Sequence, residues 1–256
     1  DCINYGKISY YWTENDGSGT SGITQLAGVI CAPCGPVSNC HNYGDIEYKS
    51  SYVTTIINHL SYIGGVVASD YYAKSQSSAN ITDCTNEGNI NLDINTGTSN
   101  NAAGGIVGWP GKESSCTNVT RNCVNKGNIT FSGEGKVRLG GIQGGSGAID
   151  ACVNEGNITV NSSNSGSVYG GLAGFHSGGY ILTNSTNTGS VVANVAATGV
   201  GGMAGNLGNS EHVAGKMLNN TINCFVKGHD GTCGVGMVCG HFNGNTKTIY
   251  IGSAAE

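Results

Sequence analysis

The chain has 256 residues, of which only 11% are charged, and its formal net charge is −5 at pH 7. Low charge combined with 38% hydrophobic residues argues against an intrinsically disordered chain, which is normally rich in charge. The 11 lysines and arginines form no basic stripe, so no nucleic acid is expected as a partner. No apolar run reaches the roughly 18 residues that a membrane-spanning helix needs, so no membrane insertion is expected.

A short motif recurs about seven times along the chain, with Cys, Asn, Gly and Ile at alternate positions. A period of two residues is typical of a strand with one buried face. The central Asn-x-Gly indicates a corner, because Asn and Gly both tolerate positive φ. The copies are residues 2–8, 40–46, 84–90, 123–129 and 152–158, a sixth with Ser185, Asn187, Gly189 and Val191, and a degenerate seventh with Cys224, Val226, Gly228 and Asp230.

A second, glycine-rich motif alternates with the first. Its strong copies, residues 104–108, 140–144, 170–174 and 201–205, read Gly-Gly-x-x-Gly, and weaker copies occupy residues 27–29, 64–66 and 236–238. This motif resembles the GLUG motif, a repeat of bacterial surface and secreted proteins, and the resemblance covers nearly the whole chain. It implies an extracellular location at the surface of the bacterial outer envelope. It transfers no catalytic residue, because such repeats carry none that is known.

The shortest repeat, residues 123–151, predicts the architecture. It contains three strand-like pieces, at 128–131, 137–143 and 148–152, separated by glycine and serine clusters. Three strands and three corners correspond to one triangular turn of a solenoid, whose apolar face is buried only when rungs stack. We therefore predict one all-β domain over residues 1–256, a right-handed parallel β-helix or solenoid of about seven rungs with loop insertions. We expect this domain to be a fragment of a longer surface protein.

Stacking predicts what the repeated polar residues do. The Asn residues of successive copies would form an internal ladder of side-chain amides, bonded to each other and to corner backbone. The cysteines would form a parallel ladder of reduced thiols, although eleven cysteines leave a disulfide framework as the alternative. Cys31-Ala32-Pro33-Cys34 favours a loop disulfide or two thiols over zinc, because no second Cys-x-x-Cys follows at zinc-site spacing. No metal and no cofactor is expected.

The acidic residues bear on catalysis. Enzymes that cleave glycans on a β-helix need paired carboxylates. Here Glu87, Lys126 and Glu155 occupy equivalent positions of neighbouring copies, which predicts a solvated salt-bridge ladder. We therefore expect no enzymatic activity and no catalytic residue. The alternatives are a carbohydrate-active β-helix enzyme, such as a polysaccharide lyase or hydrolase, and a structural spacer without a ligand of its own.

Aromatic residues indicate where a ligand would bind. Nine of the 12 tyrosines precede residue 73, and the loops there are the longest. The predicted ligand-binding residues are Tyr10, Tyr11, Trp12, Tyr71 and Tyr72. The structural alternative is that these aromatics form a small core under the N-terminal insertions. With binding, the protein would be an adhesin whose partner is a glycan or a host-surface protein.

Overall fold

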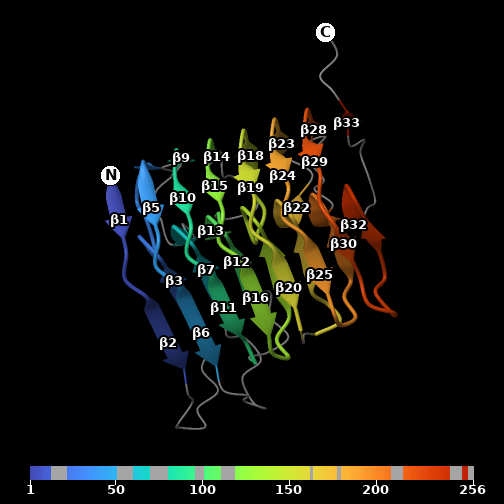
Figure 1. The fold of residues 1–256 in the computed structure, drawn as a ribbon, viewed down its shortest axis with the longest axis horizontal. Helices are drawn as coiled ribbons and strands as arrows, with labels where there is room; N and C mark the ends of the chain where they lie inside the picture. The colour runs from blue at the N-terminus through green and yellow to red at the C-terminus, as the bar shows by residue number, and fades with distance from the viewer. Residues whose placement is uncertain are drawn as a thin grey trace.

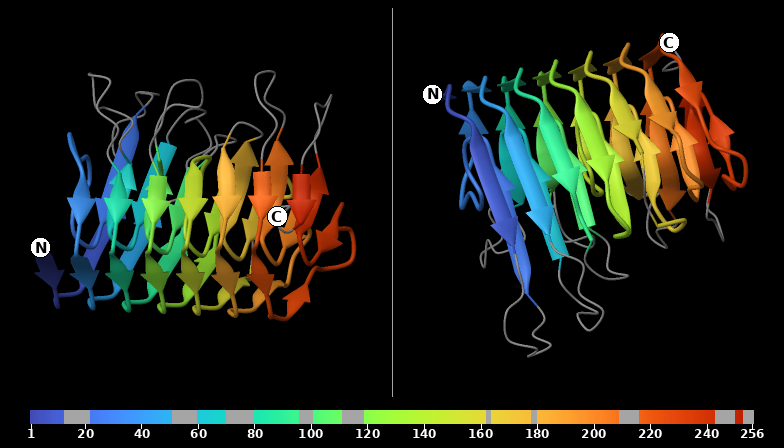
Figure 2. Two further views of the ribbon diagram at one scale, coloured as in Figure 1. Left: turned by 90° about the horizontal axis from the view of Figure 1, so that it is seen from above. Right: turned by 60° about the horizontal axis from the view of Figure 1, so that its bottom comes forward.

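The computed structural model describes residues 1–12, 22–50, 60–69, 80–95, 101–110, 119–161, 164–177, 180–208, 216–242 and 250–252. These residues contain no helix, and their parallel strands wind into a stack of seven rungs (Figure 1). The first and the last rung lie at opposite ends of the stack (Figure 2). The predicted all-β parallel solenoid of about seven rungs is therefore confirmed.

Equivalent strands of successive rungs pair in parallel and form sheets that run along the stack. Sheet A contains β1 (Cys2–Asn4), β5 (Cys40–Asn42), β10 (Thr85–Asn86), β15 (Val124–Asn125), β19 (Val153–Asn154), β24 (Thr186–Asn187) and β29 (Thr221–Ile222). Sheet B contains β2 (Ile8–Trp12), β6 (Ile46–Ser50), β11 (Ile90–Asp93), β16 (Ile129–Ser132), β20 (Ile158–Val160), β25 (Val191–Ala193) and β30 (Val226–Lys227). The first motif thus supplies both sheets, with its Asn-x-Gly corner between them.

Three further sheets complete the rungs. Sheet C contains β3 (Ile23–Ala27), β7 (Leu60–Gly64), β12 (Asn101–Gly104), β17 (Val137–Gly140), β21 (Val168–Gly170), β26 (Gly199–Gly201) and β31 (Val235–Gly236). Sheet D is formed by β8 (Val67–Ser69) with β13 (Val107–Trp109), and by β22 (Ala173–Ser177) with β27 (Ala204–Gly208) and β32 (Cys239–Phe242). Sheet E contains β4 (Val37–Ser38), β9 (Ile81–Thr82), β14 (Val119–Arg121), β18 (Ala148–Asp150), β23 (Ile181–Thr183), β28 (Lys216–Leu218) and β33 (Tyr250–Gly252).

The shortest rung shows that the cross-section is not a triangle. Its three predicted pieces correspond to β16, β17 and β18, but β15 forms a separate strand of sheet A and Gln143 bridges the two parts of sheet D. The prediction of three sides is wrong because the chain reverses at the glycine-rich motif. Sheet D consequently folds back against sheet C and adds a layer that three-sided winding lacks.

Two cores fill the interior side by side. The first core lies between sheets B and C and includes Phe131, Leu139 and Tyr169, all fully buried. The second core lies among sheets A, D and E and includes Cys123 and Ile149, which are also fully buried. Strands of sheet B contribute alternate residues, as the buried and half-buried positions of β16 show, whereas β12 of sheet C and β27 of sheet D are buried at every position. The period-two pattern of the sequence therefore marks the inward faces, as expected.

A ladder of asparagine side chains runs along the stack at the corner between sheets A and B. Nδ2 of Asn86 donates to Oδ1 of Asn125 at 2.8 Å, and Nδ2 of Asn125 donates to Oδ1 of Asn154 at 2.8 Å. Each amide also donates to backbone within its own corner, as Asn125 does to the carbonyl oxygen of Gly127 at 3.0 Å. The members are Asn4, Asn42, Asn86, Asn125, Asn154 and Asn187. The predicted ladder is confirmed.

The glycine-rich motif is shaped by close approaches. A Cβ atom on Gly105 would lie 2.2 Å from Cγ of Asn125, so the second glycine of the motif makes room for the asparagine ladder. A Cβ atom on Gly108 would lie 2.6 Å from the carbonyl oxygen of Ile63, so the last glycine lets sheet D press against the backbone of sheet C. Contacts of 2.2 and 2.6 Å are far below van der Waals separation, so no other residue fits without backbone movement. The asparagine motif and the glycine-rich motif of the sequence therefore pack directly against each other.

The last rung has a different register from the one predicted. Thr186 pairs with Thr221 and Val191 pairs with Val226, so the seventh copy begins at Asn220 and not at Cys224. Ile222 consequently takes the position of the ladder asparagine, opposite Asn187. The prediction was wrong because Cys224 lies at the position of the corner glycine and not at that of the repeat cysteine. In this rung, apolar Ile222 ends the ladder of amides.

A row of left-handed residues forms the corner between sheets E and A. Their φ angles lie between 51° and 58°, a region that Asn and Asp tolerate better than other residues with a side chain. The row is Asn39, Asp83, Asn122, Ala151, Asn184 and Asn219. Ala151 is its single alanine and has no polar side chain to compensate for the strained backbone.

The asparagine ladder predicts that Asn125→Ala lowers the free energy of unfolding substantially. This change removes the acceptor of one N–H of Asn86 Nδ2, which keeps its bond to Gly88, and it removes the donor to Oδ1 of Asn154 and to the carbonyl oxygen of Gly127. Two or more buried orphan groups should lower the free energy of unfolding by on the order of 3 kcal/mol in a urea titration. The matched control is Asn128→Ala in the same rung, because Asn128 belongs to an exposed ladder. Equal losses for both variants would contradict the role of burial.

The left-handed row predicts that Ala151→Asn stabilises the protein. Asparagine adopts a φ of 52° at lower cost than alanine, so the free energy of unfolding should rise by about 0.5–1 kcal/mol. The reciprocal change Asn122→Ala, at the equivalent corner one rung earlier, should lower it by a similar amount. Thermal unfolding of both variants would measure this, and a destabilised Ala151→Asn variant would contradict the explanation.

Candidate binding surface

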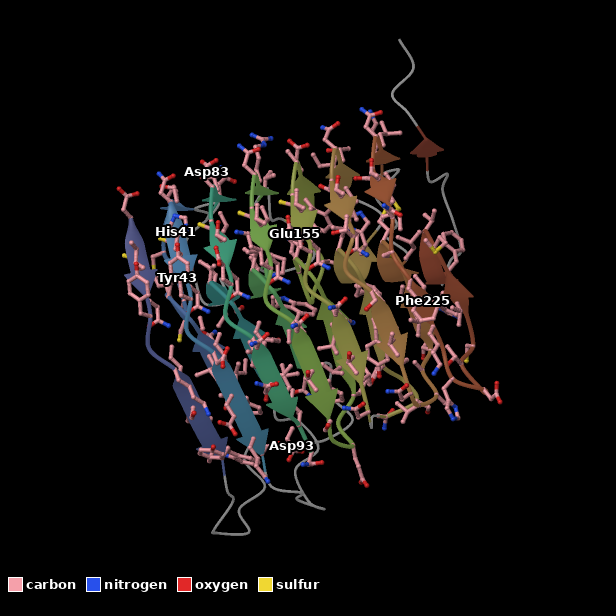
Figure 3. The ribbon with its side chains drawn as sticks, viewed as in Figure 1. His41, Tyr43, Asp83, Asp93, Glu155 and Phe225 are labelled. Carbon is pink, nitrogen blue, oxygen red and sulfur yellow. The ribbon has the colours of Figure 1, made fainter. Side chains whose placement is uncertain are left out.

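Exposed aromatic side chains gather on the outer face of the first two rungs of sheet A. We call Ile3, Tyr5, His41 and Tyr43 the tyrosine surface. The rings of Tyr5 and Tyr43 stack with centroids 5.0 Å apart and planes 8° from parallel, and their side chains are 74% and 41% exposed. The ring of His41 lies beside that of Tyr43, 6.3 Å away and inclined by 13° (Figure 3). Ile3, which pairs with His41, is 58% exposed and adds an apolar edge.

Strand alternation turns these side chains outward. In β1 and β5, cysteine and asparagine occupy the inward positions, so the residues between and after them face solvent. The register that pairs Asn4 with Asn42 also brings Tyr5 next to Tyr43. The backbone N–H of Tyr43 donates to the carbonyl oxygen of Asn4 at 2.8 Å, which holds the two corners together. The ladder that organises the interior therefore aligns the tyrosines outside it.

The same outer row becomes charged in the following rungs. Nζ of Lys126 lies 3.0 Å from Oε1 of Glu87, and the carboxylate raises the pKa of the Lys126 ammonium by hydrogen bonding and by its charge. Glu155 contributes a further attraction to Lys126 from the next rung. The Glu87–Lys126 ion pair confirms the first part of the predicted salt-bridge ladder, whereas Glu155 acts on Lys126 through its charge alone. Such a row presents alternating charges and does not bring two carboxylates together.

The predicted binding residues divide between two faces of β2. The ring of Tyr10 stacks on buried Tyr48, with centroids 5.8 Å apart, and the hydroxyl of Tyr48 bonds to Oγ of Ser61 at 2.9 Å. Half-buried Trp12 is on the same face, two residues further along β2. Tyr10 itself is 38% exposed and Trp12 is half-buried, so both rings are partly accessible beside the buried Tyr48.

Tyr11 lies on the other face of β2 and is 57% exposed. It lies beside an ion pair between Nζ of Lys7 and Oε2 of Glu47, which are 2.6 Å apart. Hydrogen bonds from Lys7 and then from Tyr11 lower the pKa of Glu47. Tyr71 and Tyr72 lie outside the described residues. The described members Tyr10, Tyr11 and Trp12 are adjacent along β2, and the tyrosine surface is a second exposed aromatic group, which sequence reasoning missed.

Other carboxylates of the described residues also contact cationic or neutral polar side chains. Asp150 lies 2.9 Å from Nε of Arg121 and accepts hydrogen bonds from Thr183 and Asn184. Burial alone would raise the pKa of Asp150, but these hydrogen bonds outweigh burial and lower it. Asp93 lies 3.6 Å from Nζ of Lys49. Within the described ranges, no group of three or more His, Cys, Asp or Glu could hold a metal ion.

The cysteine ladder occupies the second core. Each thiol donates to the carbonyl oxygen two residues earlier, as Cys84 does to Thr82 at 3.1 Å and Cys123 does to Arg121 at 3.2 Å. A side-chain hydrogen bond with Cys123, together with burial, raises the pKa of Cys84. None of the ten described cysteines is in a disulfide, which agrees with the predicted reduced ladder. Cys224 is not a member, because the last rung places it at the position of the corner glycine.

A column of stacked side chains, buried at Tyr62 and Trp109 and half-buried at Arg138 and Phe175, joins sheets C and D. Tyr62 stacks on Trp109 at 5.5 Å, and the guanidinium carbon of Arg138 lies 5.0 Å from the Trp109 ring and 4.1 Å from the Phe175 ring. Alternate members come from sheets C and D of successive rungs. The column crosses the shortest rung, where Gln143 alone represents sheet D. The sequence carries no periodic signal for it, because its members belong to neither motif.

His176 of sheet D is the most strongly buried titratable nitrogen group of the described residues. Its Nε2 lies 3.2 Å from the carbonyl oxygen of Tyr180, and its Nδ1 has no hydrogen-bond partner in the described part of the chain. Burial lowers the pKa of His176 to about 4, and the contact with Tyr180 opposes this shift only partly. The imidazole is therefore neutral at pH 7 and packs as a core residue.

Burial of the ladder predicts selective alkylation. Iodoacetamide should modify the exposed thiols of the folded protein. It should reach the buried Cys84, Cys123 and Cys152 only after unfolding, because the reagent needs access to a thiolate and burial prevents this access. Peptide mass spectrometry before and after denaturation would measure this. The exposed thiols Cys2, Cys31, Cys34 and Cys233 serve as internal controls. Rapid modification of Cys123 in the folded state would contradict the prediction.

His176 predicts a stability loss in acid. An unfolded histidine binds a proton below about pH 6.5, whereas His176 in the folded protein does so only below about pH 4. Stability should therefore fall as the pH drops from 6.5 to 4, by up to about 3 kcal/mol from this group. The variant His176→Gln cannot titrate at this position. The difference in the free energy of unfolding between the parent protein and this variant should therefore shrink as the pH falls from 6.5 to 4, as measured in urea titrations. A pH-independent difference would contradict the assignment.

Comparison with known proteins does not assign the chain to a family. No helix of the described residues is long and apolar enough to cross a membrane. No family model matches the chain, and no curated protein and no solved structure matches it either. Its function is therefore inferred from the surfaces described above.

Proposed function

We propose that this protein is a non-enzymatic repeat scaffold of a bacterial cell surface, or a secreted one, that acts as an adhesin. The observation that carries this proposal is the tyrosine surface, where two stacked tyrosines, a histidine and an isoleucine face solvent on a rigid sheet. The ligand is a glycan or a host-surface protein. The resemblance of the glycine-rich motif to the GLUG repeat supports the extracellular location.

The chemistry of tyrosine supports a binding role. Tyrosine offers a large amphipathic contact area with few rotatable bonds, so little conformational entropy is lost when a ligand orders it. Stacking of Tyr5 on Tyr43 restricts both rings before any ligand arrives. Such a preorganised site loses less free energy on binding than a flexible one. Exposed apolar side chains are also costly in water, which supports a functional reason for Ile3.

The acidic residues favour binding over glycan cleavage. Cleavage needs two carboxylates in a shared site, one as acid and the other as base or nucleophile. In the described residues, Glu87 pairs with Lys126, Glu47 with Lys7 and Asp150 with Arg121. Each of these carboxylates thus contacts a cation and not a second carboxylate. The alternative of a polysaccharide lyase or hydrolase therefore has less support, and the spacer alternative leaves the tyrosine surface unexplained.

The proposal predicts that Tyr5→Ala and Tyr43→Ala each weaken binding to a glycan array or to host cells. The loss should be about tenfold or more, which corresponds to about 1.4 kcal/mol for an exposed aromatic contact. Their melting temperatures should change little, because both side chains face solvent. The matched control is Thr188→Ala, at the equivalent outer position of a later rung, which should bind like the parent protein.

Three outcomes would decide against the proposal. Unchanged binding by both tyrosine variants would move the ligand site elsewhere. Absence of binding by the parent protein to glycans and host cells alike would favour the spacer. Release of reducing ends or unsaturated sugars from any polysaccharide would show that the protein is an enzyme.

A further inference from the structure

The pair Tyr5–Tyr43 has a geometry suited to covalent coupling. Its ring centroids are 5.0 Å apart and its planes nearly parallel, and both phenol groups are exposed to solvent. The two residues are far apart in sequence, but the register of Asn4 with Asn42 keeps them adjacent. Because the side chains lie on the outer face, they can turn from stacking into bond-forming contact without disturbing the core.

We propose that Tyr5 and Tyr43 are a modification site at which oxidation joins the first two rungs through a dityrosine bond. The oxidant is hydrogen peroxide used by a haem peroxidase. The inference is independent of any ligand of the tyrosine surface. It rests on the distance, the parallel rings and the exposure of the pair.

Coupling of the two tyrosines consumes one molecule of hydrogen peroxide. The peroxidase removes one electron and the phenolic proton from each tyrosine, and hydrogen peroxide is reduced by these two electrons and protons to two molecules of water. Each tyrosyl radical carries unpaired density on the ring carbon ortho to oxygen, and two such carbons form the new bond. The coupled rings are then cyclohexadienones, and the hydrogens of the two bonded carbons move as protons to the carbonyl oxygens, which restores both aromatic phenols. The product has lost two hydrogen atoms.

Proximity favours coupling within one molecule over coupling between molecules. Radicals held beside each other react as an intramolecular pair, whose effective concentration far exceeds that of dilute protein. The backbone hydrogen bond from Tyr43 to Asn4, 2.8 Å long, keeps the two corners at this spacing. Coupling closes a covalent loop around one rung, which should raise the melting temperature because the unfolded chain loses freedom.

The chain contains a matched pair that should not couple. Tyr10 and Tyr48 stack with centroids 5.8 Å apart and planes 9° from parallel, similar to the first pair. Tyr48, however, is only 1% exposed, and its hydroxyl bonds to Ser61. A peroxidase reaches surface phenols, so stacking without exposure is not sufficient. Comparing the two pairs therefore separates accessibility from ring geometry.

The experiment treats the dilute full chain with a haem peroxidase and hydrogen peroxide. Dityrosine fluorescence and mass spectrometry of tryptic peptides report the product. In the parent protein we expect a monomer that has lost two hydrogen atoms, with a bond between Tyr5 of peptide 1–7 and Tyr43 of peptide 8–49. Tyr5→Phe and Tyr43→Phe should each abolish this bond while keeping the ring stack. Tyr10→Phe should retain it.

Three outcomes of this experiment would reject the dityrosine proposal. A cross-link of the same yield in Tyr5→Phe would show that another pair is the site. Cross-links found only between molecules would show that the stacked pair has no advantage. Oxidation of Tyr11 without any dityrosine would show that exposure alone governs the reaction, and it too would reject the proposal.

Discussion

The fold depends on one contact, the meeting of the asparagine ladder with the glycine-rich turn. Asn125 satisfies its amide through the rungs before and after it and through its own corner. Gly105 must lack a side chain because the ladder occupies that space. Buried amides are tolerated only when their hydrogen bonds are complete, so the ladder enforces in-register stacking. Both sequence motifs follow from this single requirement.

In-register stacking also determines what the surface can display. Once inward positions are assigned to cysteine, asparagine and isoleucine, the residues between them form straight outer rows at rung spacing. One row begins with Tyr5 and Tyr43 and continues with Glu87 and Lys126. Neighbours along such a row interact regardless of their separation in sequence. The same spacing between equivalent outer residues of successive rungs therefore permits aromatic stacking, ion pairing or covalent coupling, depending on the residues present.

The interior and the surface also differ in chemical reactivity, because in-register stacking buries one set of positions and exposes the other. Thiols such as Cys84 are buried and have a raised pKa, so they are poor nucleophiles despite their number. His176 is likewise neutral and enclosed, and its effect is limited to stability in acid. The phenols of Tyr5 and Tyr43, in contrast, are exposed to solvent. Reactivity and recognition are thus expected on the outer rows, while the repeated residues of the interior maintain the stack.

The sequence alone determined the parallel solenoid and its asparagine ladder, because both follow from a repeated motif with a period of two. Residues outside that period could not be placed in the same way. Only tertiary structure decided that sheet D folds back on sheet C, that Arg138 stacks between Trp109 and Phe175, and that Ile222 ends the ladder. It also separated Tyr10, stacked on buried Tyr48, from Tyr5 on the outer face. Such contacts depend on the register and facing of strands from different rungs, which local sequence does not encode.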